Sequence, residues 1–133
     1  MMIWPLILIL AAAVAAVLAV GFRYLKDRRQ HQMDSNEHGT AVALWEFSRT
    51  VKARLAEVST GKVAVLDFNT ITMPRGPGYK LSLELTARGF SIWAVPRRYG
   101  RTGRLSFYVG NAVCVRAMDR GGEQAGPEDP EYV

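Results

Sequence analysis

The chain has 133 residues and a formal net charge of +5, which leaves room for one domain with a modest core. Its single cysteine excludes an internal disulfide and a four-thiolate zinc site. The charge is uneven, because residues 75–104 hold seven basic side chains and one acid, whereas residues 119–133 hold five acids and one arginine.

The first element is an apolar run from Ile3 to Phe22, twenty residues without a charge. A helix of that length spans roughly 30 Å, the thickness of the hydrocarbon core of a bilayer. We therefore expect residues 1–29 to form a single-pass membrane anchor with a basic flank. The Ala-rich residues 11–19 leave a cleaved signal peptide as the alternative, although no Lys or Arg precedes the run.

A basic cluster follows the apolar run and predicts the orientation of the anchor. Under the positive-inside rule such a flank stays in the cytoplasm, so the domain that follows is expected there too. The same side chains also suit the anionic head groups of a bilayer. This membrane-flank cluster consists of Arg23, Lys26, Arg28 and Arg29, with Asp27 among them.

The next two segments predict a hinge and then an amphipathic helix. Residues 30–39 are polar and contain Ser, Asn and Gly, which favours a hinge or the frayed end of the membrane helix. From residue 40 to residue 58, apolar side chains recur every three or four residues, and Thr40 is a suitable N-cap. These apolar side chains form one stripe, which needs a sheet or another helix to cover it. The stripe consists of Leu44, Phe47, Val51, Leu55 and Val58.

The second half of the chain predicts short antiparallel strands. Residues 62–68 form one candidate strand, and residues 79–86 form another, in which leucines alternate with polar residues. Residues 79–86 pair with residues 90–95 in a hairpin, where Gly89 can adopt positive φ. We place Trp93 on the sheet face that the helix covers. The leucines that share one face are Leu81, Leu83 and Leu85.

A second hairpin is predicted between residues 104–109 and 112–118, with Gly110 and Asn111 at its turn. Cys114 falls in the second of these strands, and we interpret it as a buried, unreactive thiol. The fold class is therefore α+β: a transmembrane helix, then an amphipathic helix packed on a four- to five-stranded antiparallel sheet. The domain is expected at residues 40–118, followed by an acidic, flexible tail at residues 119–133.

Residues that carry chemistry are few. His31, Asp34 and His38 have the donor types and spacing of a zinc site on one helix face, but the residues after Asp34 disfavour a helix, so we interpret them as solvated hinge residues. The sequence has no nucleophile beside a base, no phosphate-binding loop and no dinucleotide fingerprint. We therefore expect no catalytic activity, no metal and no cofactor.

The candidate contact surface is the basic loop between two predicted strands at residues 97–104. Strands on both sides leave no helix N-terminus for a phosphate, so we expect a charged contact surface and not an active site. Its arginines keep the loop soluble or meet the acidic tail, and we place Arg75 on the same surface. The candidate contact residues are Arg75, Arg97, Arg98, Tyr99, Arg101 and Arg104.

Two classes of partner suit such a surface. The first is protein, meaning other components of a membrane assembly or a second copy of the chain. The alternative is nucleic acid or anionic lipid, which basic side chains with nearby rings can bind. We rank nucleic acid lower because the acidic tail can neutralise the basic face in the same molecule.

A string of short motifs carries a resemblance to a known family. The motifs are "PGYKLSLEL", "GFSIWAVP", "TGRLSFYV", "VRA" and "EDPEY", between residues 78 and 132. Together with the order of apolar helix, amphipathic helix and sheet, they resemble type IV pilins and pseudopilins. The resemblance implies a pilin-like domain, a structural role in a membrane-associated assembly and a periplasmic location, against the charge rule.

The N-terminal third departs from that family. No glycine precedes Gly21 and no acid precedes Asp27, so the prepilin peptidase site and the assembly glutamate have no counterpart. The sequence therefore favours a pilin-like domain on an uncleaved anchor over a pilus subunit.

The side of the membrane on which the domain lies is directly testable. A reporter fused after Val133 is expected to be active in the cytoplasm, because the membrane-flank cluster should remain on that side. A reporter that is active only in the periplasm would overturn the charge rule here and favour the orientation that the pilin resemblance implies.

Overall fold

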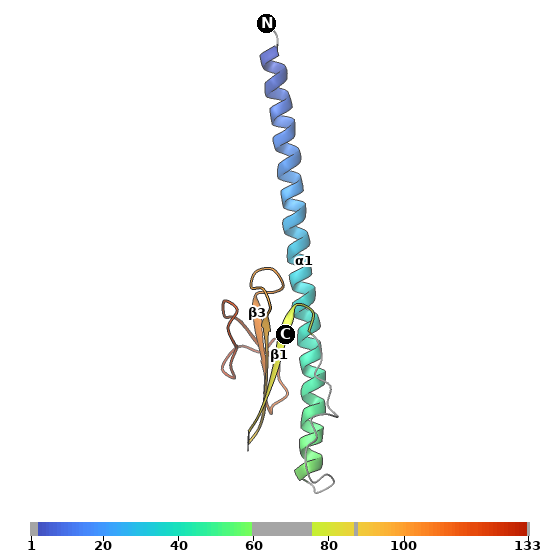
Figure 1. The fold of residues 1–133 in the computed structure, drawn as a ribbon, viewed down its shortest axis with the longest axis vertical. Coiled ribbons are helices and arrows are strands. Elements are labelled where there is room, and N and C mark those ends of the chain that lie inside the picture. The colour runs from blue at the N-terminus through green and yellow to red at the C-terminus, as the bar shows by residue number, and fades with distance from the viewer. Residues whose placement is uncertain (1–2, 60–75, 87, 133) are drawn as a thin grey trace. The chain divides into compact units, whose positions relative to one another are not determined.

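A computed structural model describes residues 3–59, 76–86 and 88–132 (Figure 1). The chain divides into two compact units, residues 1–32 and 33–133. The described part is α+β, with one long helix and a four-stranded antiparallel sheet. The predicted strand at residues 62–68 and Arg75 lie outside the described residues. The elements are α1 (Ile3–Ser59), β1 (Tyr79–Thr86), β2 (Gly89–Pro96), β3 (Leu105–Val109) and β4 (Arg116–Asp119).

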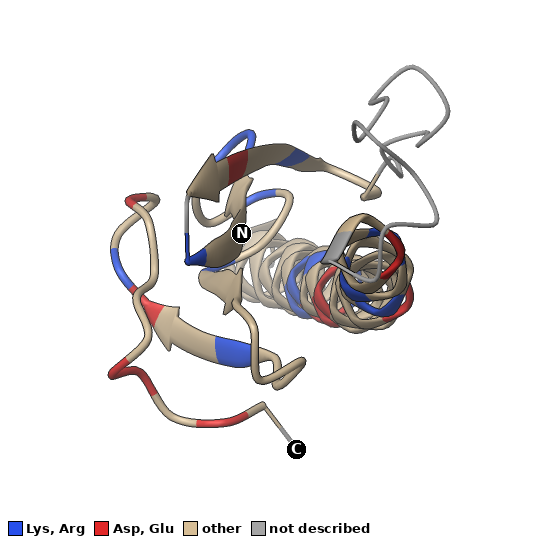
Figure 2. Cartoon of the chain, turned by 90° about the horizontal axis from the view of Figure 1, so that it is seen from below, with Lys and Arg blue, Asp and Glu red and all other residues tan. Residues whose placement is uncertain are grey.

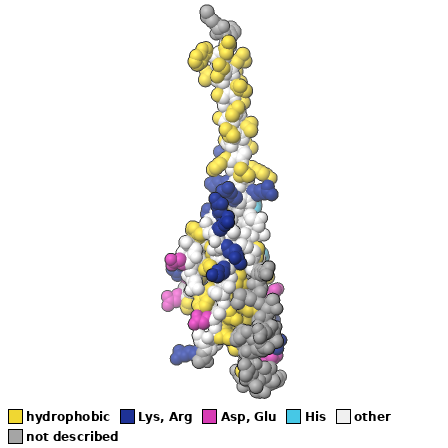
Figure 3. Space-filling view, viewed as in Figure 1, with side chains coloured by type: hydrophobic (Ala, Val, Ile, Leu, Met, Phe, Trp, Pro, Cys, Tyr) yellow, Lys and Arg dark blue, Asp and Glu magenta, His cyan; other side chains and the backbone are white. Residues whose placement is uncertain are grey.

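The first unit is the N-terminal part of α1, whose apolar side chains are exposed. From Ile3 to Gln32 each described side chain is exposed, and Trp4 keeps 75% of its accessible surface. Residues 3–22 carry no charge, and Figure 3 shows apolar side chains along this part of the helix, above the blue basic side chains. The mean hydropathy of the most apolar 18 residues is 2.8, so this helix is long and apolar enough to span a membrane.

Residues 30–39 are helical, so the frayed helix end, one of the two predictions, is not present in the backbone, and the boundary between the two units, after residue 32, lies within the predicted hinge. The physical reason lies in tertiary contacts that the sequence pattern does not show. Met33 and Asn36 are buried, and the Asn36 side-chain amide donates a 2.9 Å hydrogen bond to the Thr102 carbonyl. Such contacts outweigh the low helix propensity of Asn and Ser. Thr40, predicted as an N-cap, is therefore buried inside α1.

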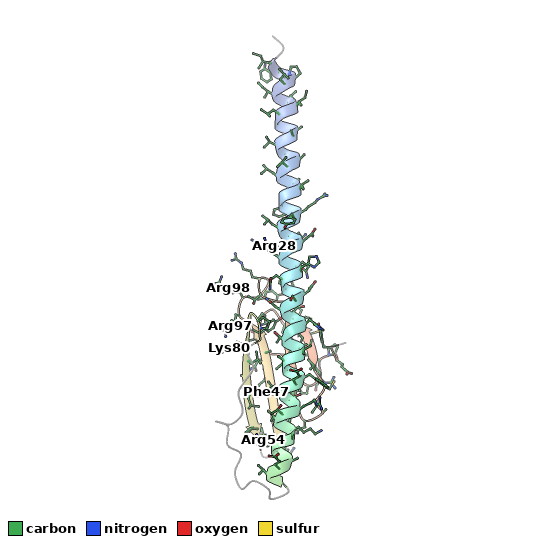
Figure 4. All side chains as sticks on the ribbon, turned by 90° about the vertical axis from the view of Figure 1, so that its right-hand side faces the viewer. Arg28, Phe47, Arg54, Lys80, Arg97 and Arg98 are labelled. Carbon is green, nitrogen blue, oxygen red and sulfur yellow. The ribbon has the colours of Figure 1, made fainter. Side chains whose placement is uncertain are left out.

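The predicted apolar stripe packs on the sheet and forms the core of the second unit. Leu44, Phe47 and Val51 are buried, and Figure 4 shows Phe47 on the side of α1 toward the strands. Leu55 is half-buried and packs against the same core. On the sheet side, the core is completed by Tyr79, Phe90, Ile92, Ala94, Phe107 and Val109.

The sheet is an antiparallel meander in the order β1-β2-β3-β4. The β1 leucines face the helix as predicted, because Leu83 pairs with the buried Ile92 and packs against the core. The predicted position of Trp93 is wrong. Since Ile92 and Ala94 face α1, Trp93 lies on the opposite face, with its ring centroid 6.0 Å from that of Tyr108.

The two hairpins differ in how well the sequence predicted them. The first has Gly89 at φ 144°, and the side-chain amide of Asn111 brackets this turn, accepting from Phe90 N at 3.0 Å and donating to Arg88 O at 2.9 Å. The second hairpin has a longer connection, because β4 begins at Arg116. Its positive φ, 53°, falls on Val113 and not on the predicted glycine–asparagine pair.

The predicted flexible tail is instead packed against the sheet through residue 132. Ala117 N donates to Pro130 O at 2.9 Å, and Tyr132 N donates to Val115 O at 2.8 Å, which extends the pairing beyond β4. The Tyr132 ring meets Phe107 edge-on, with 5.3 Å between centroids. The second unit therefore includes the acidic segment, whose charged positions follow β4 in Figure 2.

A cavity-creating substitution tests the core. Because Leu44 is fully buried between helix and sheet, Leu44→Ala is expected to lower the free energy of unfolding by roughly 2–5 kcal/mol. The matched control is Val42→Ala, at a position on the same helix that is 43% exposed. Denaturant unfolding of the full chain in detergent measures both, and equal effects would contradict this packing.

Candidate functional site

The basic loop at residues 97–104 joins β2 to β3 and has a defined backbone. Gly100 N donates to Gly103 O at 2.9 Å, and Arg101 N donates to Arg98 O at 3.0 Å. Gly100 adopts φ 76°, a conformation that other residues rarely adopt. Gly103 lies against the ring of Tyr79, which leaves no space for a side chain there.

Two side chains of α1 hold this loop in place. The Glu37 carboxylate accepts hydrogen bonds from the backbone N–H groups of Arg104 at 2.9 Å and Leu105 at 3.2 Å. Asn36 binds the carbonyl of Thr102 from the same turn of helix. Bonds to a charged acceptor are stronger than neutral ones. The helix thus fixes the loop by binding its backbone at Thr102, Arg104 and Leu105.

Tyr79 joins the loop to the core. Its hydroxyl donates a 2.6 Å hydrogen bond to Leu105 O, and its ring lies 5.6 Å from that of Phe107. Burial, and then the nearby carboxylate of Glu37, raise the pKa of Tyr79 well above its usual value. The hydroxyl therefore remains protonated and keeps its role as a donor at neutral pH.

The candidate arginines of the loop are exposed. Arg97 and Arg98 are labelled at the loop in Figure 4, and Arg97 Nε donates to Tyr79 O at 3.3 Å. Within residues 3–59, 76–86 and 88–132, the ion pairs are Arg54–Glu57 and Arg120–Asp129, so no loop arginine is paired with a carboxylate there. Four guanidinium groups are thus available to a partner: Arg97, Arg98, Arg101 and Arg104.

The loop meets the acidic segment through a hydrogen bond from its tyrosine. The Tyr99 hydroxyl donates to both carboxylate oxygens of Asp119, at 2.8 and 3.0 Å. This bond, with a second from Gly121 N, holds the pKa of Asp119 below its usual range. The positive charge of Arg104 also lowers that pKa, in line with the expectation that loop arginines meet the acidic segment.

The acidic segment has its own internal ion pair. Arg120 donates to both oxygens of the Asp129 carboxylate, which is buried and also accepts a 2.8 Å hydrogen bond from Gly126 N. These contacts, the arginine first, hold the pKa of Asp129 below its usual range. The contacts of Arg120 and Gly126 with Asp129 thus close residues 120–129 into a loop.

The membrane-flank cluster belongs to the first unit. Its members Arg23, Lys26, Arg28 and Arg29 lie on α1 with exposed side chains, and Figure 4 labels Arg28. Exposed cations directly after an apolar helix suit contact with phosphate head groups.

The other sequence candidates form no metal site among the described residues, although His38 and Cys114 both line the groove described below. His31, Asp34 and His38 have exposed side chains on α1, and no group of three or more His, Cys, Asp or Glu in the described ranges is placed to hold a metal ion. Cys114 lies in the connection before β4 and not in a strand, and it is half-buried. Desolvation, then a hydrogen bond to Glu131, raises the pKa of its thiol and keeps it protonated.

The sequence reasoning missed a groove of about 470 Å³ in the second unit. It lies between α1 and two later segments, the connection at residues 113–115 and the C-terminal residues 131–132. Trp45, 43% exposed, is its largest side chain, and the guanidinium of Arg49 lies 4.8 Å from the centroid of that ring. The sequence signal for this groove was Trp45, a large aromatic residue outside the predicted apolar stripe.

Comparison of the chain with protein-family models, with curated proteins and with solved structures finds no match.

The attachment of the loop to α1 is testable through Glu37. Glu37→Ala removes the acceptor of two amide hydrogen bonds, each worth roughly 1.5–3 kcal/mol for a charged acceptor, so the Arg104 and Leu105 amides should exchange at least ten-fold faster. Glu37→Gln keeps an oxygen acceptor and is the matched control, with a smaller effect. Hydrogen exchange read by NMR measures this, and unchanged protection in Glu37→Ala would contradict the assignment.

Proposed function

We propose that this protein is a membrane-anchored, non-catalytic interaction component of a pilin-like, membrane-associated assembly. The observation that carries the proposal is the apolar part of α1, in which twenty consecutive uncharged residues are exposed. Exposed apolar surface of that extent is rare in soluble monomers and requires a membrane or a protein partner. A bilayer can surround such a helix on all sides, because its backbone N–H and C=O groups are already hydrogen-bonded within the helix.

The pilin-like part of the proposal draws its support from the order of elements. An apolar helix comes first, an amphipathic stripe on the same helix packs against a sheet, and the sheet is an antiparallel meander. This order and the motifs between residues 78 and 132 are those of the resemblance described above. We propose that the anchor is retained, because its apolar run has the full length of a membrane span.

Protein is favoured over nucleic acid as the partner because of the state of the rings near the arginines. A ring must be free to stack on bases in a single-stranded nucleic-acid site. The Tyr99 ring is 47% exposed, but its hydroxyl is bound to the carboxylate of Asp119, whose negative charge repels a phosphate backbone there. Trp93 contacts Tyr108 on the sheet face that points away from α1. The arginines remain, and guanidinium groups bind carboxylates of a protein with two parallel hydrogen bonds.

Membrane insertion is tested by carbonate extraction of membranes from cells that express the full chain. The wild type should stay in the pellet, whereas Leu10→Arg with Val14→Arg should release it, since a central arginine opposes insertion by roughly 2.5–3.5 kcal/mol. The control places two arginines at exposed positions outside the apolar run, Thr50 and Ala53. Extraction of the wild type by carbonate would contradict the anchor.

A further inference from the structure

We infer that the groove beside α1 binds the basic loop of a second copy of this chain. This inference rests on the proposed function, which supplies the anchor, and it names the partner. The groove, called the acidic groove below, has an apolar floor and two carboxylates. Its floor consists of Ala41, Val42, Trp45 and Val113, and its carboxylates are Glu46 and Glu131.

The floor of the acidic groove consists of apolar side chains that are partly exposed to solvent. Val42 and Trp45 are each 43% exposed, although both lie on a helix whose opposite face forms the core. Val113 lines the same groove at φ 53°, a conformation that is uncommon for a β-branched residue. The floor thus offers contact area to the aliphatic stem of a long side chain.

The carboxylates are available to a cation. Glu46 and Glu131 are exposed, and neither belongs to an ion pair in the described part of the chain. Glu131 interacts with the thiol of Cys114, which is a weak hydrogen-bond donor. Beside them, one face of the Trp45 ring is covered by the guanidinium of Arg49 of the same chain, 4.8 Å from the ring centroid. The apolar floor and the two carboxylates together fit an arginine side chain.

The chain itself presents arginines of this kind. The basic loop holds four exposed guanidinium groups, and none of them belongs to an ion pair among the residues that the structure describes, although the charge of Arg104 lowers the pKa of Asp119. The loop is bound to Asn36, Glu37 and Asp119, and none of its residues lines the acidic groove. The groove of one copy is therefore open to the loop of another.

Anchoring favours this contact. Two copies with the same anchor orientation present both surfaces on the same side of the membrane, and confinement to the membrane raises their effective concentration. Because loop and groove are different surfaces, the contact is heterologous, so each copy retains one free loop or one free groove. Screening of exposed charges predicts that the association weakens as salt rises.

Charge reversal on the full chain in detergent micelles tests the inference. Two populations carrying different dyes on terminal tags are mixed, and energy transfer between the dyes measures the apparent dissociation constant. Arg101→Glu in the loop and Glu131→Arg in the groove should each weaken association about ten-fold or more, because attraction becomes repulsion. Mixing the two variants should restore association, because the unchanged loop of Glu131→Arg can bind the unchanged groove of Arg101→Glu, and their two reversed surfaces are also complementary.

The controls carry the same change in net charge at other exposed positions. Lys80→Glu matches Arg101→Glu, and Glu84→Arg matches Glu131→Arg, both on β1. Circular dichroism confirms that each variant is folded. If Glu131→Arg disturbs the C-terminal pairing, Glu46→Arg on the helix replaces it, with the same expectation.

Each outcome decides the inference. Loss in both single variants, recovery in their mixture and no effect of the controls support it. Association that neither reversal weakens, or that both controls weaken equally, overturns the loop–groove contact. Wild-type chain that stays monomeric overturns it too. In these cases the proposed membrane anchor is still supported if carbonate extraction leaves the wild type in the pellet. Failure of the loop–groove contact is therefore distinguishable from failure of the anchor.

Discussion

The packing of one helical stripe on one sheet face is the contact on which the rest of the second unit depends. Leu44, Phe47 and Val51 lose nearly all their accessible surface against Ile92 and Phe107. Burial of such side chains contributes roughly 1.5–3 kcal/mol each, whereas an isolated two-stranded hairpin is marginal in water. The helix therefore gives the meander the second layer that it needs.

The candidate contact surface follows from that packing. Because the stripe packs on the sheet, the part of α1 before it lies beside the loop between β2 and β3, where Asn36 and Glu37 bind backbone groups of the loop. The backbone of the loop is thereby fixed, whereas the side chains of its arginines remain exposed. The same packing leaves Trp45 partly exposed beside the C-terminal segment, which creates the acidic groove. The packing of the helix on the sheet thus positions both the basic loop and the acidic groove, the two surfaces that we propose to interact.

Local patterns predicted most of the fold, and tertiary contacts account for the errors. Strict alternation predicted β1 to the residue, because its leucines share the face that the helix covers. The helical conformation around Asn36 was not predicted because its side chain binds Thr102, 66 residues away, and the packing of the C-terminal segment was not predicted because it depends on the contact of Tyr132 with Phe107. Of the candidate site, the exposed arginines were predicted, whereas the acidic groove joins segments whose proximity no local pattern reveals.

The central claim is that residues 36–55 of α1 and the sheet form one cooperative unit through their shared core. Native-state hydrogen exchange of the full chain in nanodiscs tests it, because amides that open together report the same free energy. The account predicts equal opening free energies for the amides of Leu44 and Val51 in the helix and of Ile92 and Phe107 in the sheet. Helix amides that open at much lower free energy than the sheet amides would contradict it.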